Sequence, residues 1–219
     1  MGSMGSLFRQ IADQTKFTSL LIFLVGFGGL MLVETFLRAN AIAGVYFHGI
    51  PSESMMQTVS ILDLRDQAWI SLWNIHIQPP LFDLMRAALA YFSDTSSHLH
   101  LQYQVDQGIY VIWAIAYGLI CALIYFWLSK LTNNWWAAIS ALLFAGSPAA
   151  LLYATILETS LLSSLFVLVL IFLLWKIAHG ETVSPWFLGI SFLLLFFTRS
   201  VFQWPWIFLL GVCLIVMRY

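Results

Sequence analysis

The sequence predicts an all-helical integral membrane protein, and three observations carry this prediction. Of the 219 residues, 61% are hydrophobic and 9% are charged, and the mean hydropathy is +0.90, whereas about a quarter of the residues of an ordinary soluble protein are charged. The apolar residues form runs of about 20, the length that a helix needs to cross a bilayer. The net charge of −1, with scattered basic residues, gives no positive surface, so no nucleic-acid partner is expected.

Six apolar runs predict six membrane-spanning helices, because backbone polar groups inside a bilayer must be satisfied within the helix itself. The runs lie near 17–37, 107–128, 135–153, 159–177, 185–199 and 202–217. We interpret residues 1–219 as a single transmembrane module. Its parts are a first span (16–38), a long outer loop (39–106) and the remaining spans (107–219).

Polar residues concentrate in the segment 39–106, where charges interrupt the apolar pattern too often for a span. Pro79 and Pro80 favour a helix start, and the helix after them has an apolar face opposite Asp83 and Arg86. That face comprises Leu81, Leu84, Met85, Ala88 and Leu89. We expect this helix to lie on the membrane or to be only shallowly inserted, with a second short helix upstream of it.

Basic residues near the ends of the spans predict the orientation in the membrane. If the segment 39–106 does not cross, five of the basic residues near span ends fall on the opposite, cytoplasmic side. These residues are Arg9, Lys16, Lys130, Lys176 and Arg218. A crossing at 80–96 would move Lys130 and Lys176 outside, so we favour the non-crossing arrangement. Both termini are then cytoplasmic, and Glu158 and Arg199 face the same non-cytoplasmic side as the segment 39–106.

Three charges lie within or at the ends of apolar runs, where an ionised group costs at least ~2.5 kcal/mol on insertion scales. Glu34 is four residues before Arg38, which permits a local ion pair. Glu158 either marks a helix boundary or serves catalysis or substrate binding. Arg199 either anchors its helix at the membrane interface or binds a phosphate bidentately.

Other candidate residues have less specific patterns. His76 and Gln78 precede the proline pair and either contact a ligand or cap the following helix. Cys121 and Cys213 lie within apolar runs, which favours small buried residues over a disulfide or a metal site. The sequence therefore assigns no cofactor, and it leaves a requirement for a divalent metal open.

The order and spacing of these motifs resemble the N-terminal core membrane module of the C-type (GT-C) glycosyltransferases, particularly the protein O-mannosyltransferases and the lipid A aminoarabinose transferases. IPSESMMQTVSILDLRDQAW is similar to the acidic opening of that family's first outer loop, and HIQPPLFDLM to its closing Pro-Pro motif. LLFAGSPAALLYATILETSLLSSLFVLVLIFLLW resembles the third helix, the second acidic turn and the fourth helix. FLGISFLLLFFTRSVFQW resembles the next helix, which ends in a Thr-Arg or Thr-Lys pair, here Thr198 and Arg199.

The resemblance implies a GT-C-like helical core with about six transmembrane helices and juxtamembrane helices in the first outer loop. It also implies transfer of a hexose or pentose from a polyprenyl-phosphate-linked donor to a lipid, glycan or protein acceptor. The location that it implies is the non-cytoplasmic face, most simply the periplasmic or extracellular face of a bacterial inner membrane. Because family members have several hundred residues, we expect the native chain to continue beyond Tyr219.

The resemblance also implies roles for individual residues. Glu53 would be the base or the acid that positions the acceptor, and Glu158 the second acid. The phosphate and the rest of the substrate would be bound by Arg199, Arg65, Arg86, His76 and Gln78. Ser52 stands where the family motif usually has its first aspartate, and Gln78 stands where several members have a cation or histidine.

Two other functions are compatible with the sequence. In a noncatalytic membrane subunit or truncated relative, the segment 39–106 would dock a partner and the acids would be structural. A small transporter fits less well. Its binding site at the middle of the membrane is expected to be formed by a pair of helices broken by Gly or Pro, and the sequence does not show such a pair.

Overall fold

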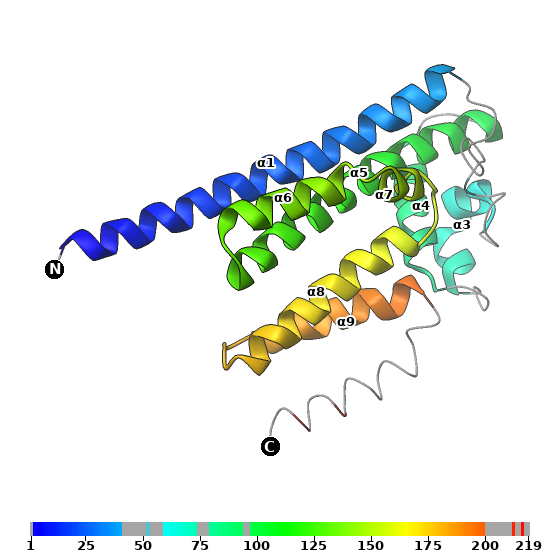
Figure 1. Ribbon diagram of the computed structural model, residues 1–219. Helices are drawn as coiled ribbons and strands as arrows, with labels where there is room; N and C mark the ends of the chain where they lie inside the picture. The colour runs from blue at the N-terminus through cyan, green and yellow to red at the C-terminus, as the bar shows by residue number, and fades with distance from the viewer. Residues whose placement is uncertain are drawn as a thin grey trace. The chain divides into compact units, whose positions relative to one another are not determined.

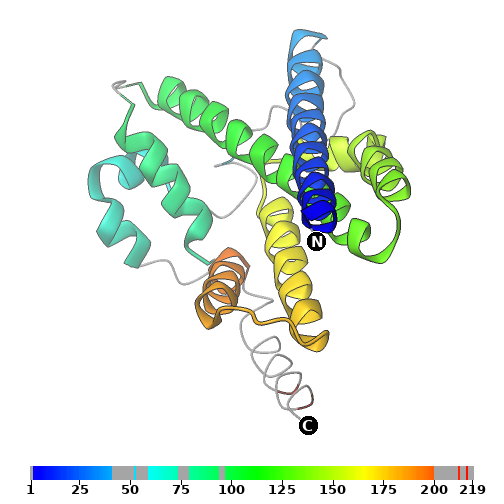
Figure 2. The same ribbon diagram turned by 90° about the vertical axis from the view of Figure 1, so that its left-hand side faces the viewer.

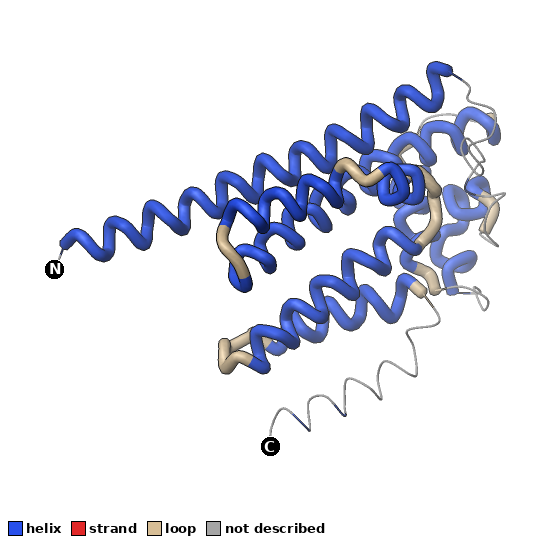
Figure 3. Tube along the Cα trace, in the orientation of Figure 1, coloured by secondary structure: helices blue, strands red, loops and turns tan. Residues whose placement is uncertain are grey.

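The computed structural model describes residues 2–40, 52, 59–73, 79–93, 97–199, 212 and 216, and in the first helix it describes the side chains of residues 14–37. Every secondary-structure element in this part of the chain is a helix, and none of these residues forms a strand (Figure 3). The predicted all-helical fold class is therefore confirmed.

Three described helices are long and apolar enough to cross a membrane, which indicates a membrane protein. They are α1 (Gly2–Asn40) through its Gln14–Leu37 part, α5 (His98–Leu131) and α8 (Ser160–Ala178). A fourth span results if α6 (Asn134–Ala145) and α7 (Pro148–Ala154), which are bent by 55°, are counted as one.

The count of six spans stays a prediction. The fifth predicted span corresponds to α9 (Pro185–Thr198), which is apolar but has 14 residues and falls short of a crossing length. The last predicted run, 202–217, lies outside the described residues except for residues 212 and 216.

The chain divides into two compact units, each made of two separate stretches. Unit 1 consists of Met1–His48 and Val111–Ile156, and unit 2 of Gly49–Tyr110 and Leu157–Tyr219. Helix α5 passes from unit 2 into unit 1. The prediction of a single transmembrane module is not tested by this division and stays a prediction.

In unit 1, two glycines let α1 and α5 approach closely. A Cβ added at Gly26 would lie 3.2 Å from the Cα of Gly118, and a Cβ at Gly118 would lie 2.8 Å from the backbone oxygen of Phe23. Small residues at such contacts are typical of membrane helices, which associate through close packing because lipid is as apolar as their side chains. The same α1 helix packs along α6 (Figure 1).

The bend between α6 and α7 has a sequence cause and a compensating partner. Pro148 is the first residue of α7 and has no backbone N–H, so the helix restarts there with Ser147 as its N-cap. The restart leaves carbonyl groups at the end of α6 without helical partners. The Tyr117 hydroxyl on α5 donates to the carbonyls of Phe144 and Ala145, at 3.2 Å each. Where a helix breaks inside a membrane, its free backbone carbonyls need hydrogen-bond donors of this kind.

In unit 2, the described part of the segment 39–106 contains a helix upstream of the proline pair and a helix after it. They are α3 (Ile61–Trp73), which is kinked at Gln67, and α4 (Leu81–Tyr91). Helix α4 begins directly after Pro80, whose φ of −79° suits a first turn. The two helices pack against each other. Their position on the membrane surface stays a prediction.

Helix α4 has the two opposite faces that its sequence predicts, and the face with the charges is the buried one. Asp83 and Arg86 are buried, at 2% and 0% exposure, whereas Leu84 is 48% exposed. The two charges pair with each other inside the unit, and apolar side chains remain outside, as is favourable in a lipid environment.

Helices α8 and α9 pack against each other and are joined by a short turn, so they form an antiparallel hairpin (Figures 1 and 2). Gly180 lies in the left-handed region with φ of 75°, and the N–H of Glu181 donates to the carbonyl of Lys176 at 3.0 Å. This closes α8 with a Schellman motif. Ser184 and Pro185 then start α9. Because the turn joins the end of α8 to the start of α9, the first residues of α8 lie beside the last residues of α9.

Candidate functional site

At the open end of the α8–α9 hairpin, a serine joins an acid to a guanidinium. The Ser160 hydroxyl donates to Glu158 Oε1 and accepts from Arg199 Nη1 at 3.0 Å. A hydroxyl can do both at once, because it has one donor and two acceptor positions. The structure thus brings together Glu158 and Arg199, which the sequence singled out. The connecting Ser160 had no predicted role, although its place two residues after Glu158 was visible.

The helix ends favour both charges. Glu158 precedes the N-cap of α8, where the helix has partial positive charge, and Arg199 is the C-cap of α9, where the charge is partially negative. The 14 residues of α9 span about 21 Å, which is less than the ~30 Å of a hydrocarbon core. Arg199 bonds to Ser160, the first residue of α8. This bond and the nearby Glu158 carboxylate offset the cost of holding a guanidinium at the end of an apolar helix.

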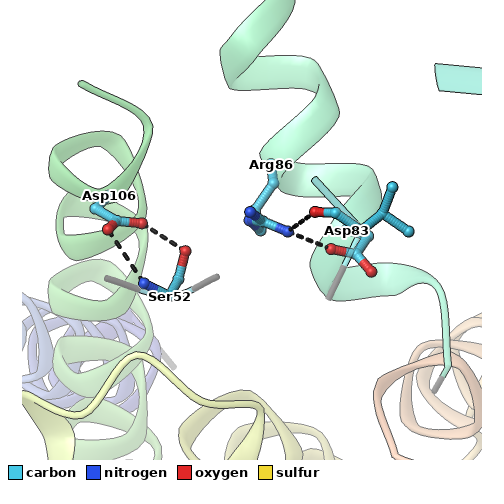
Figure 4. Close-up of polar contacts among 5 residues, drawn as sticks. Ser52, Asp83, Arg86 and Asp106 are labelled. Carbon is cyan, nitrogen blue, oxygen red and sulfur yellow. Dashed lines mark hydrogen bonds and ion pairs between the residues drawn. The ribbon is translucent and has the colours of Figure 1, made fainter. Parts of the chain in front are cut away.

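A second polar centre of unit 2 is built around the buried Arg86. Its Nη1 donates to Asp83 Oδ1 at 2.7 Å and to the carbonyl of Val59 at 2.8 Å (Figure 4). Asp83 and Arg86 are three residues apart on α4, so their side chains share one face. The side chains of this ion pair are 3% and 0% exposed. The centre therefore depends on mutual compensation of two charges that water does not reach.

Asp106 on α5 forms a third polar contact in unit 2, and the sequence reasoning missed it. Its carboxylate accepts from the Ser52 hydroxyl at 2.6 Å and from the Ser52 backbone N–H at 3.2 Å (Figure 4). Both residues are buried. The predicted second span began at 107, which left Asp106 in the loop. Because α5 begins at His98, this acid lies inside a helix that continues into the apolar run, which is the signal that should have marked it.

Several buried donors close to these contacts have no acceptor. Within the described part of the chain, Nε and Nη2 of Arg86 and Nε2 of Gln102 make no hydrogen bond. Gln102 is 6% exposed and lies one turn before Asp106 on α5. Each buried polar group without a partner costs ~1–3 kcal/mol. Groups of this kind call for a specific explanation, such as a ligand or bound water.

Arg65, the remaining predicted phosphate-binding arginine that the structure describes, pairs with a neighbour on the surface of α3. Its Nε donates to Asp66 Oδ1 at 2.8 Å. This hydrogen bond lowers the pKa of Asp66 and raises the pKa of Arg65. Both groups are accessible to solvent, so the pair is worth little to stability.

Other predicted site residues cannot be placed. Glu53, His76 and Gln78 lie outside the described residues. Glu34 is buried on α1 in unit 1, at 5% exposure, but the side chain of its predicted partner Arg38 is not described.

An apolar cavity of about 470 Å³ adjoins α3, α4 and α9 in unit 2. Its lining is Trp69, Leu72, Trp73, Pro80, Leu84 and Phe197. Phe197 is two residues before Arg199, so the lining extends to the helix end that holds the guanidinium. A cavity of this volume and chemistry suits a hydrocarbon segment, since it offers apolar contact with few polar groups.

No protein-family model, curated protein or solved structure matches the chain. Among the described residues, no group of three or more His, Cys, Asp or Glu side chains is arranged to hold a metal ion. The fold and its polar centres define a helical membrane protein with charged groups inside unit 2.

Proposed function

We propose that the protein is a membrane glycosyltransferase, which transfers a sugar from a polyprenyl-phosphate donor to an acceptor on the non-cytoplasmic face. The observation that carries the proposal is the Glu158–Ser160–Arg199 cluster. Transfer of a sugar from a lipid phosphate to a hydroxyl needs a cation beside the leaving phosphate and a carboxylate near the attacking hydroxyl. This cluster supplies one of each, at residues that the GT-C resemblance had indicated independently of their contact.

In the proposed reaction, the acceptor hydroxyl attacks the anomeric carbon of the sugar in a single inverting displacement. A carboxylate takes the hydroxyl proton, and the bond from the anomeric carbon to the phosphate oxygen breaks. The departing lipid phosphate keeps the electron pair, and Arg199 neutralises its charge. Glu158 and Glu53 are the two candidate acids, while Arg65 and Arg86 are further candidate cations.

The apolar cavity supports the same proposal, because it suits the lipid part of the donor. A polyprenyl carrier has a long hydrocarbon chain directly attached to its phosphate. The cavity lies against α9 with Phe197 in its lining, and Arg199 caps the same helix. We propose that the first isoprene units of the carrier occupy this cavity while the phosphate binds Arg199.

A noncatalytic subunit is the second candidate, and one observation favours it. Trp69 and Trp73 of α3 are 77% and 80% exposed, and exposed aromatic residues are typical of surfaces that bind partners. On this alternative, the Glu158–Ser160–Arg199 cluster would only stabilise the hairpin.

The test is sugar transfer in proteoliposomes that contain the full chain. The donors are undecaprenyl phosphates with radiolabelled hexoses or pentoses, and the acceptors are membrane lipid, glycan and protein fractions. Loss of an acid catalyst typically costs 10²–10⁴-fold in rate, so we expect Glu158→Gln to reduce transfer at least ~100-fold. Glu181→Gln is the matched control, because Glu181 is an exposed acid paired with Lys176 at the other end of the hairpin.

A further inference from the structure

The starting observation is that one edge of the Arg86 guanidinium is occupied and the other is open. Nη1 bonds to Asp83 and Val59, whereas Nε and Nη2 have no partner within the described residues. These two nitrogens form the side-on fork of a guanidinium, which binds two acceptor atoms at once. Because Arg86 is fully buried, the open fork points into the protein and not into solvent.

Other polar groups of unit 2 accompany this fork. In the view of Figure 4, Asp83 lies on one side of the guanidinium and the Asp106–Ser52 pair on the other. Gln102 shares the face of Asp106 on α5, and its Nε2 is a further buried donor without a partner in the described part of the chain. The side chain of Leu89 on α4 reaches α5, since a Cβ added at Gly108 would lie 2.9 Å from it.

The charges decide which ligand suits this centre. Asp83, Arg86 and Asp106 comprise two carboxylates and one guanidinium, a formal excess of one negative charge. A buried phosphate would add like charge beside two acids, which is unfavourable where water does not screen it. A neutral ligand avoids this repulsion. Open donors together with a carboxylate acceptor match hydroxyl groups, which both accept and donate hydrogen bonds.

We propose that Arg86, Gln102 and Asp106 form a sugar-binding subsite for the donor, in which the open fork and the Gln102 amide donate to ring hydroxyls and Asp106 accepts from one. The proposal rests on the glycosyltransferase function and deepens it. It assigns the phosphate to Arg199 and the sugar to Arg86, whereas the sequence had grouped both arginines as substrate-binding cations. Asp83 acts as a positioning residue, because it holds Nη1 and so turns the fork toward the ligand.

The experiment compares two lipid phosphodiesters that have the same charge and differ in the sugar. Purified full-length chain is titrated with undecaprenyl methyl phosphate, the bare lipid, and with undecaprenyl phosphate bearing single hexoses or pentoses. For the wild type, we expect at least one glycosylated lipid to bind more tightly than the bare lipid. Arg86→Lys keeps a cation for Asp83 but loses the planar fork. It should weaken binding of the glycosylated lipid ~10-fold and binding of the bare lipid less than twofold. A ~10-fold loss corresponds to about one hydrogen bond from a charged donor.

A second variant separates recognition from folding. Gln102→Leu removes a buried donor that has no partner in the described structure, so we expect its Tm to stay equal or to rise. Its affinity for the glycosylated lipid should nevertheless fall several-fold, with no change for the bare lipid.

Four outcomes would overturn the proposal. If Arg86→Lys weakens the binding of both lipids equally, Arg86 binds the phosphate. If neither variant changes the preference for the glycosylated lipid, or if the wild type has no such preference, there is no sugar subsite at Arg86. In each of these results the carrier still binds, so the proposed function stands. If the wild type binds neither lipid, the proposed function itself fails and the subsite fails with it.

Discussion

Removing the carboxylate of Asp83 tests the energetics of the buried centre in unit 2. The Asp83→Leu variant leaves the Arg86 guanidinium buried, with one remaining bond from Nη1 to Val59. Breaking a buried ion pair at one partner typically costs ~3–5 kcal/mol, because a charge is left uncompensated. For a chain of this length, that cost lowers Tm by roughly 6–20 °C.

The double variant Asp83→Leu with Arg86→Met provides the control, since it removes both charges and keeps apolar volume. Replacing a buried ion pair by hydrophobic residues is often neutral or stabilising. We therefore expect the double variant to recover most of the lost stability, as measured by thermal unfolding in detergent micelles. Unfolding of Asp83→Leu at the wild-type temperature, or simple additivity of the two substitutions, would show that the two charges do not compensate each other.

Three further predictions concern other parts of the molecule. Gly118→Ala should destabilise the protein by ~1–3 kcal/mol in thermal unfolding, because its Cβ meets backbone of α1, whereas Gly28→Ala, with open space around it, should not. Leu72→Trp should fill the apolar cavity and raise KM for long-chain donors more than for short-chain donors; an equal effect on both would argue against a hydrocarbon site. Arg65→Gln should raise the lowered pKa of Asp66 toward its ordinary value in an NMR titration, which shifts the loss of the carboxylate charge to higher pH.

The sequence was informative about helices and their ends because those depend on local chemistry. Apolar runs located the long helices, Pro80 marked the start of α4, and Glu158 and Arg199 were recognised as charges at the ends of apolar runs. Their contact through Ser160 follows from the hairpin, since helices joined by a short turn return the chain to its starting level.

The sequence was uninformative where burial depends on tertiary partners. The burial of the charged face of α4 could not be predicted, because a helical pattern alone does not reveal that Asp83 and Arg86 neutralise each other inside the unit. Asp106 was overlooked because the start of α5 could not be placed from hydropathy, which marks the apolar run and not the polar turns that precede it. Its contact with Ser52 joins residues 54 positions apart, a separation that no local pattern encodes.

The most direct test of the central claim is the rate of sugar transfer by wild type, Glu158→Gln, Arg199→Gln and Glu181→Gln chains in the same proteoliposomes. We predict transfer by the wild type and by Glu181→Gln, and a loss of at least ~100-fold for Glu158→Gln and for Arg199→Gln. Arg199→Lys should recover part of the activity, because it restores the positive charge without the fork. Transfer at the wild-type rate by both Glu158→Gln and Arg199→Gln, or no transfer by the wild type from any donor, would contradict the claim.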